Sequence, residues 1–439
     1  MRRLLALCLT LSAATQMARA REVDVDGRVS LRGYYSADSA GYTPVGITFL
    51  ETDAKVTGLT ELELGLLLDA TFILDATEAN ERRFGETEGI GQVRQLHVEQ
   101  PRLLGRFDLS FGRKLLFEAG NAWVDGLDAE VWFDRRRASL GVYGGLSPDR
   151  FDRSLTPDYQ AAGVYGTFHR DGLDLSAAYN ALLFEGELDR HWAFNRAHWK
   201  AGDGLFLSSY LVVDFAERAA VTTWLGTVDY TPIPAVNLAL NLSRYSIEQF
   251  RNQAVYRNVV EPNQALILGD EIIDLVYNRA RLSASLRVWR TVYHYQSLEL
   301  KQRSQDGRDS FLYTVGIRDD DLAGTGLRVD LSGQLVNNFL SDSYLVSLDL
   351  ARDLAGQLGL GARLTWFDGR TVGRATERGR TFDEAQQVVL MGVGVNWRLS
   401  QSHHLDAWYD GIYEAELQDA RNAENLFIHT GMLRYSWLY

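Results

Sequence analysis

Apolar side chains recur at every second position along most of this 439-residue chain. Residues 427–439 show the pattern most clearly. One set of alternate positions holds Phe427, Gly431, Leu433, Tyr435, Trp437 and Tyr439, and the other holds Thr430, Arg434 and Ser436. Because successive side chains of a strand point to opposite faces, the segment predicts a strand with one apolar face and one polar face.

Similar alternating runs follow one another from residue 29 onward. They lie at 29–35, 62–74, 107–111, 138–142, 173–183, 205–215, 236–242, 282–288, 327–335, 358–366 and 391–397. After residue 20 no stretch approaches the 18 or so consecutive apolar residues that a spanning helix requires. A mean hydropathy of -0.19 agrees with a barrel, since only alternate residues of a barrel strand touch lipid.

The connections between these runs alternate in length. Short turns are expected at 57–60, 101–106, 169–172, 201–204, 231–235 and 399–402, and long loops at 76–91, 146–160, 246–276, 368–385 and 414–425. Transmembrane barrels have short periplasmic turns and longer extracellular loops. We therefore predict an all-β, transmembrane, antiparallel up-and-down β-barrel of about 22 strands, with a range of roughly 18 to 22 and without a plug domain.

The N-terminus has the features of a Sec signal peptide. Arg2 and Arg3 precede an apolar run at 4–14, and Ala18-Arg19-Ala20 offers small residues to a peptidase. We expect a signal peptide at 1–20 and a barrel domain at 21–439. The only cysteine, Cys8, lies in the signal, so the mature chain forms no disulfides. Removal of the signal peptide changes the formal net charge from -13 to about -16, and a chain this acidic is not expected to bind nucleic acid.

Leu433, Tyr435, Trp437 and Tyr439 resemble the closing strand of bacterial outer-membrane β-barrels. In that family the β-barrel assembly machinery reads a terminal aromatic residue with further apolar residues at alternate positions before it. The resemblance implies localisation in the outer membrane of a Gram-negative bacterium, with membrane lipid and the assembly machinery as partners. For the tail alone, an amphipathic strand at the end of a soluble domain is the alternative.

Residues 95–131 resemble a recurrent pattern of porin-like and alginate-export-type barrels, in which a Gly-Arg strand leads into a loop that reaches an Asp-Gly step. The matching pieces are Gly112-Arg113 and Asp125-Gly126. The loop between them is too apolar for bulk water, so it could fold into the lumen as a constriction. The candidate constriction residues are Glu118, Trp123 and Asp125. An extracellular lid is the alternative.

Alternation also assigns charged residues to the lumen. A basic wall is expected from Arg28, Arg32, Arg281, Arg287, Arg328 and Arg363, and an acidic wall from Glu63, Asp69, Asp108, Glu130 and Asp174. Because the first strand pairs with the last, the two walls would face each other and produce a field across the pore. In the alternative interpretation, these charges pair with neighbours on adjacent strands and hold the barrel rigid. In the alginate-export family, arginine lines the pore throughout, whereas the inward positions of this chain hold both basic and acidic residues.

None of the eight histidines stands in a spacing typical of a catalytic or metal site. We therefore predict no catalytic residue, cofactor or metal. The expected function is a porin-like, water-filled channel for passive passage of hydrophilic solutes. One alternative is an outlet for a secreted polysaccharide that works beside a periplasmic export complex. Another is a closed barrel that acts as an envelope scaffold or adhesin.

Overall fold

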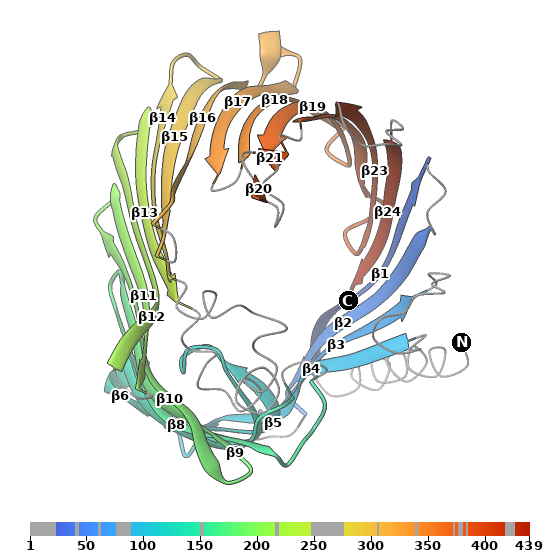
Figure 1. Ribbon diagram of the computed structural model, residues 1–439. Helices are drawn as coiled ribbons and strands as arrows, with labels where there is room; N and C mark the ends of the chain where they lie inside the picture. Colours follow the sequence, from blue (N-terminus) through green and yellow to red (C-terminus); the bar gives the residue numbers. More distant parts are fainter. Residues whose placement is uncertain are drawn as a thin grey trace.

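A computed structural model describes the chain at residues 23–39, 44–59, 63–75, 89–149, 153–215, 219–246, 276–304, 307–338, 341–371, 374–375, 381–382, 385–417 and 426–439. Twenty-two of its strands form one sheet, and every neighbouring pair that closes the ring is antiparallel. Figure 1 shows the ring, with the colours running round it in chain order until the last strand meets the first. The predicted signal peptide at 1–20 lies outside the described residues.

The first half of the barrel is built from β1 (Asp24–Asp38), β2 (Val45–Thr57), β3 (Gly65–Asp75), β4 (Gly89–Leu103), β5 (Phe107–Leu116), β6 (Ala122–Phe133), β7 (Ala138–Leu146), β8 (Tyr159–Arg170), β9 (Leu173–Phe184), β10 (Glu187–Ala201) and β11 (Leu205–Phe215). The second half is built from β12 (Ala219–Ile233), β13 (Val236–Ser246), β14 (Val276–Arg287), β15 (Val292–Arg303), β16 (Asp309–Asp319), β17 (Leu327–Asn338), β18 (Ser341–Leu354), β19 (Leu358–Thr371), β22 (Ala385–Arg398), β23 (His403–Leu417) and β24 (Leu426–Leu438). A separate two-stranded sheet joins β20 (Arg374–Ala375) and β21 (Thr381–Phe382).

The ring closes through β1 and β24. Val29 lies opposite Trp437, and Tyr35 lies opposite Gly431. Each strand otherwise pairs with its neighbours in the sequence, so the topology is up-and-down. The predicted fold class and the strand count of about 22 are therefore confirmed. Closure removes free edges from the large sheet, because each of its 22 strands has a partner on both sides.

The period of two separates two faces along the strands. Leu31 is 51% exposed and Leu433 is 55% exposed, whereas their sequence neighbours Ser30 and Arg434 point to the other side of the sheet. The same contrast occurs in β8, where Val164 is half exposed and Tyr165 is buried. The outer face of the ring is therefore rich in exposed aliphatic and aromatic side chains, while the inner face holds most polar groups.

The connections differ between the two ends of the barrel. At the end where β1 begins and β24 ends, turns such as 171–172 and 202–204 are tight, and Gly172 and Gly202 adopt positive φ angles there. The strand ends that flank residues 247–275, Ser246 of β13 and Val276 of β14, lie at the opposite end. The alternation has exceptions, because β9 and β10 are joined at that long-loop end by only Glu185 and Gly186.

Among the described residues, we find no helix with the length and apolar character needed to span a membrane.

Candidate functional site in the barrel lumen

The connection between β5 and β6 lies on the inner wall of the barrel. The carbonyl oxygen of Ala119 accepts a 3.0 Å hydrogen bond from Nδ2 of Asn180 in β9, and a Cβ on Gly120 would lie 2.6 Å from the ring of Phe194 in β10. Three strands separate β6 from β10, so the connection must cross over them. Val164 and Tyr179 of the crossed strands remain exposed on the outer face, so the crossing is on the inside.

This inner-wall segment, residues 116–124, seals a compact apolar cluster against β7–β11. The buried members are Leu116, Ala119, Ala122, Val124, Tyr143, Tyr159, Ala161, Tyr165, Ala178, Leu182, Phe194 and Val212. Tyr143 donates a 2.8 Å hydrogen bond to Oδ1 of Asn180, which fixes the amide that holds Ala119. Of the buried apolar residues in the described chain, only Ala54 lies outside this cluster. The segment is therefore attached to the wall by a core of the kind found in soluble domains.

A buried carboxylate links β5, β6 and β8 next to the segment. Oδ2 of Asp128 accepts hydrogen bonds from Lys114 (2.7 Å) and Ser110 (3.3 Å), and Oδ1 accepts one from the Tyr165 hydroxyl (2.8 Å). The Asp128 side chain is 5% exposed. A buried charge with this many partners is compensated, whereas removal of one partner would leave the other charge unpaired.

The Gly-Arg and Asp-Gly steps lie opposite each other at the base of the segment. Arg113 and Asp125 form two parallel bonds of 2.6 and 2.7 Å, and Nη1 of Arg113 also reaches the carbonyl oxygens of Val93 (2.9 Å) and Arg153 (2.5 Å). A Cβ on Gly126 would lie 2.2 Å from the carbonyl oxygen of Gly144. Glycine is required there because β6 and β7 approach too closely for a side chain.

The three candidate constriction residues are distributed along this segment and β6. The ring of Trp123 carries the Arg153 guanidinium 4.5 Å from its centroid, and Asp125 is held by Arg113. Glu118 is half-buried and close enough to Glu130 to interact with it electrostatically. Of the two carboxylates, Asp125 is paired with Arg113, whereas Glu118 has no ion-pair partner among the described residues.

The predicted basic wall contains ion pairs with adjacent strands. Arg28 lies 3.1 Å from Asp53, Arg32 lies 3.4 Å from Glu51, and Arg363 lies 2.5 Å from Asp349. Arg281 donates a 3.4 Å hydrogen bond to Ser297. Arg287 and Arg328 lie at the ends of β14 and β17 that are near the chain termini, and both are exposed.

The predicted acidic wall is similarly mixed. Asp69 accepts hydrogen bonds from Arg94, Asp108 is paired with Arg136 at 2.6 Å, and Asp174 lies 2.7 Å from His169. Glu130 accepts a hydrogen bond from Ser139. Asp69 and Asp108 therefore each lie beside an arginine, as the alternative interpretation of local pairing expects.

Glu63 requires a correction. The alternating run at 62–74 predicted it on a strand, facing the lumen, but β3 begins at Gly65 and Glu63 lies in the turn before it. Its φ angle is 61°, which lies in the left-handed region and outside the extended region typical of strands. Among the described residues, the ion-pair partner of Glu63 is Arg102, at 3.8 Å.

Several inner-face residues were not predicted from the sequence. Asp53, Lys114 and Asp128 are charged partners, and Tyr143 and Asn180 hold the segment. The available signal was the placement of Tyr and Asn between small residues on the inner positions of β7–β9. Within the described ranges, no three His, Cys, Asp or Glu side chains are grouped to hold a metal ion.

Comparison with known proteins gives no match to a family model and no match among curated proteins. Solved structures with a similar chain path include OccAB1 of Acinetobacter baumannii, at 10% identity and a TM-score of 0.47, covering 94% of this chain and 97% of that chain. OccAB2 of the same organism has 12% identity and a TM-score of 0.46, covering 95% and 98%. The outer membrane protein opdK of Pseudomonas aeruginosa has 11% identity and a TM-score of 0.46, covering 95% and 99%. The fold assignment rests on the strand pairing of this chain itself.

Proposed function

We propose that this protein is an outer-membrane channel for the passive passage of hydrophilic solutes. The observation that carries the proposal is a closed ring of 22 strands whose outer face is apolar and whose inner face is lined by charged and polar side chains. A closed barrel is one of two structures that satisfy all backbone hydrogen bonds within lipid. An inner face of this composition is stable only in contact with water or with polar partners.

The inner-wall segment supports a pore that is narrowed on one side. A ring of this strand number is wide enough to leave a lumen that side chains alone do not fill. The segment covers the inside of β7–β11, whereas the buried apolar cluster does not extend to the strands from β12 onward. Solutes would therefore pass between the segment, with Glu118 on it, and the charged inner face of the opposite strands.

The remaining parts of the proposal come from the sequence. We infer that residues 1–20 direct export and are removed, and that the assembly machinery reads Leu433, Tyr435, Trp437 and Tyr439. Tyr435 and Trp437 lie on β24, which pairs with β1, so the stretch is also the closing strand of the ring. A polysaccharide outlet of the alginate-export type is the finer alternative, and it would need an export complex in the periplasm.

Single-channel conductance of the refolded mature protein in planar bilayers tests the proposal. Large, steady conductance with mild cation preference in a salt gradient is expected, because the mature chain is acidic. A lumen closed to ions would contradict a porin-like channel and favour a scaffold or adhesin. Conductance that appears only when a periplasmic complex is added would favour the polysaccharide outlet.

A further inference from the structure

A groove of about 650 Å³ is formed on the outer face of the barrel by β12–β17, close to the long-loop end. Its floor is one cross-strand row. Gly226, Leu242, Ala280, Leu300 and Phe311 follow one another in register across five neighbouring strands. The volume is in the range of pockets that hold small molecules.

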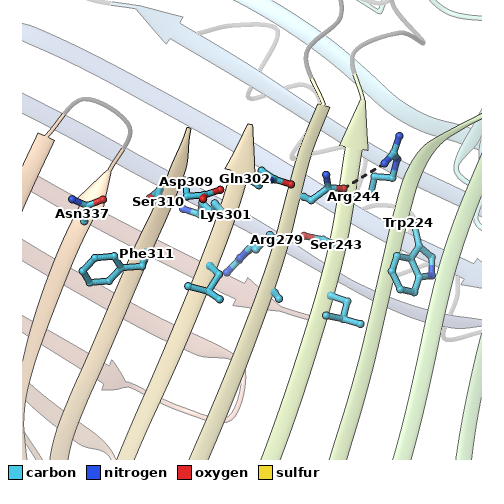
Figure 2. A pocket seen from close by; sticks show the side chains of 14 residues that line it. Trp224, Ser243, Arg244, Arg279, Lys301, Gln302, Asp309, Ser310, Phe311 and Asn337 are labelled. Atoms are coloured by element: carbon cyan, nitrogen blue, oxygen red, sulfur yellow. Dashed lines mark hydrogen bonds between the residues drawn. The ribbon is translucent and has the colours of Figure 1, made fainter. Parts of the chain in front are cut away.

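The floor is lowest at Ala280, because its neighbours in the row, Leu242 and Leu300, have larger side chains. Trp224 and Phe311 lie at the two sides (Figure 2). The Trp224 ring bends toward the floor, since a Cβ on Gly226 would lie 3.3 Å from it. The floor of the groove is therefore apolar, with an aromatic side chain at each side.

The row above the floor is polar. Arg244, Asn278, Gln302 and Asp309 lie side by side, one step nearer the long loops, as Figure 2 shows for the labelled members. Arg244 uses Nε to bond the Val221 carbonyl oxygen at 3.3 Å and Nη1 to bond Asn278 at 3.5 Å. Its Nη2 has no hydrogen-bond partner among the residues that the structure describes.

The other cations near the groove belong to the inner face. Arg279 and Lys301 alternate with the floor residues and both pair with the buried carboxylate of Glu299. Arg244 is therefore the cation that the groove presents outward. The groove therefore fits an amphiphile. Its apolar chain would lie along the floor, and its headgroup would lie against the guanidinium, the two amides and the carboxylate, toward the long loops.

We propose that this groove binds lipid A, the phosphorylated glycolipid of the outer leaflet, with an acyl chain along the floor and a phosphate on Arg244. The proposal rests on the outer-membrane location proposed above, in which the long loops face outward. Guanidinium groups bind phosphate through strong charge-assisted hydrogen bonds. The amides of Asn278 and Gln302 and the carboxylate of Asp309 suit sugar hydroxyls, which distinguish lipid A from a phospholipid.

The test uses the mature protein extracted from the outer membrane of a Gram-negative host into mild detergent, with bound lipid identified by native mass spectrometry. Arg244→Gln removes the phosphate contact, and Ala280→Phe fills the floor. Ala284→Phe is the matched control, because Ala284 lies on the same face of the same strand, two rows nearer the termini. We expect retained lipid A to fall about tenfold in both test variants and to stay at the wild-type level in the control.

Equal retention of lipid A in all four proteins would overturn the proposal, as would retention of phospholipid in its place. Heat-modifiable migration on gels shows whether each variant is folded. Conductance of the same preparations separates the two proposals. Lipid loss with unchanged wild-type conductance in the variants supports the groove, whereas bound lipid A with no conductance in any protein contradicts only the channel.

Discussion

The two sides of the ring have different inner walls. The thick arc, β5–β11, carries the inner-wall segment and a buried apolar cluster. The thin arc consists of β12–β19, β22–β24 and β1–β4; its described residues contain no such cluster, and charged side chains lie on its inner face. Asp128 in the thick arc is 5% exposed, and Asp53 in the thin arc is 48% exposed. Both carboxylates nevertheless pair with a cation on an adjacent strand.

The difference shows that the alternation of apolar and polar residues does not by itself determine the stability of a barrel wall. In the thick arc the inner side chains leave water when the segment docks, so packing and buried hydrogen bonds stabilise it. In the thin arc the inner side chains stay in contact with the lumen, where screened ion pairs contribute little. Substitutions of the same chemical type should therefore have unequal effects in the two arcs.

The largest effect is expected from Phe194→Ala. The ring packs against Gly120 and Tyr210 in the thick arc, and its removal leaves a cavity under the segment. We expect the free energy of unfolding to fall by about 3 kcal/mol or more, measured by urea titration in lipid vesicles. Leu225→Ala, at an exposed inner position of β12, is the control and should cost less than about 1 kcal/mol. Equal costs would show that the segment is not docked.

The second-largest effect is expected from Asp128→Asn. The amide cannot compensate Lys114, which would remain charged and only a quarter exposed. The expected loss is about 3 kcal/mol in the same titration, because breaking a buried pair leaves an unpaired charge. Asp53→Asn removes the partner of Arg28 in the thin arc and should cost no more than about 1 kcal/mol. A larger cost for Asp53→Asn than for Asp128→Asn would reverse the comparison.

Gly126→Ala tests the close approach of β6 and β7. The new Cβ would lie 2.2 Å from a carbonyl oxygen, so the strands must separate. We expect the free energy of unfolding to fall by about 1–3 kcal/mol. The temperature at which the folded protein changes its migration on gels should also fall. Gly431→Ala is matched to it in β24, where a Cβ meets nothing within 4 Å. A stable Gly126→Ala protein would mean that the thick arc tolerates a wider strand spacing.

The smallest effect concerns selectivity. Glu118 lies on the segment, whereas Asp349 lies on the thin arc beside Arg363. In a narrowed pore, a charge on the segment is nearer to passing ions, so Glu118→Gln should lower cation preference by up to about twofold, and Asp349→Asn should change it less. Reversal potentials in a salt gradient measure both. A greater change in Asp349→Asn would place the constriction away from the segment.

The sequence by itself determined the architecture. Alternation of side chains along β strands and the alternation of short and long connections are local patterns, and they predicted an antiparallel barrel of about 22 strands. The start of β3 was misplaced, because the apolar run at 62–74 continues through Glu63, whose left-handed backbone no alternation pattern reveals. Alternation therefore predicts that a strand is present, but it does not predict the residue at which the strand begins.

Only the tertiary structure decided which inner side chains meet. Arg28 and Asp53 face each other through the register of β1 and β2, and Asn180 reaches Ala119 across 61 residues of sequence. Alternation along a strand cannot assign the partner of a charged residue, because a shift of one residue in register changes every cross-strand pair. Docking of the segment depends on a shared apolar cluster from seven strands. That cluster exists only once β5–β11 have paired and brought those inner positions together.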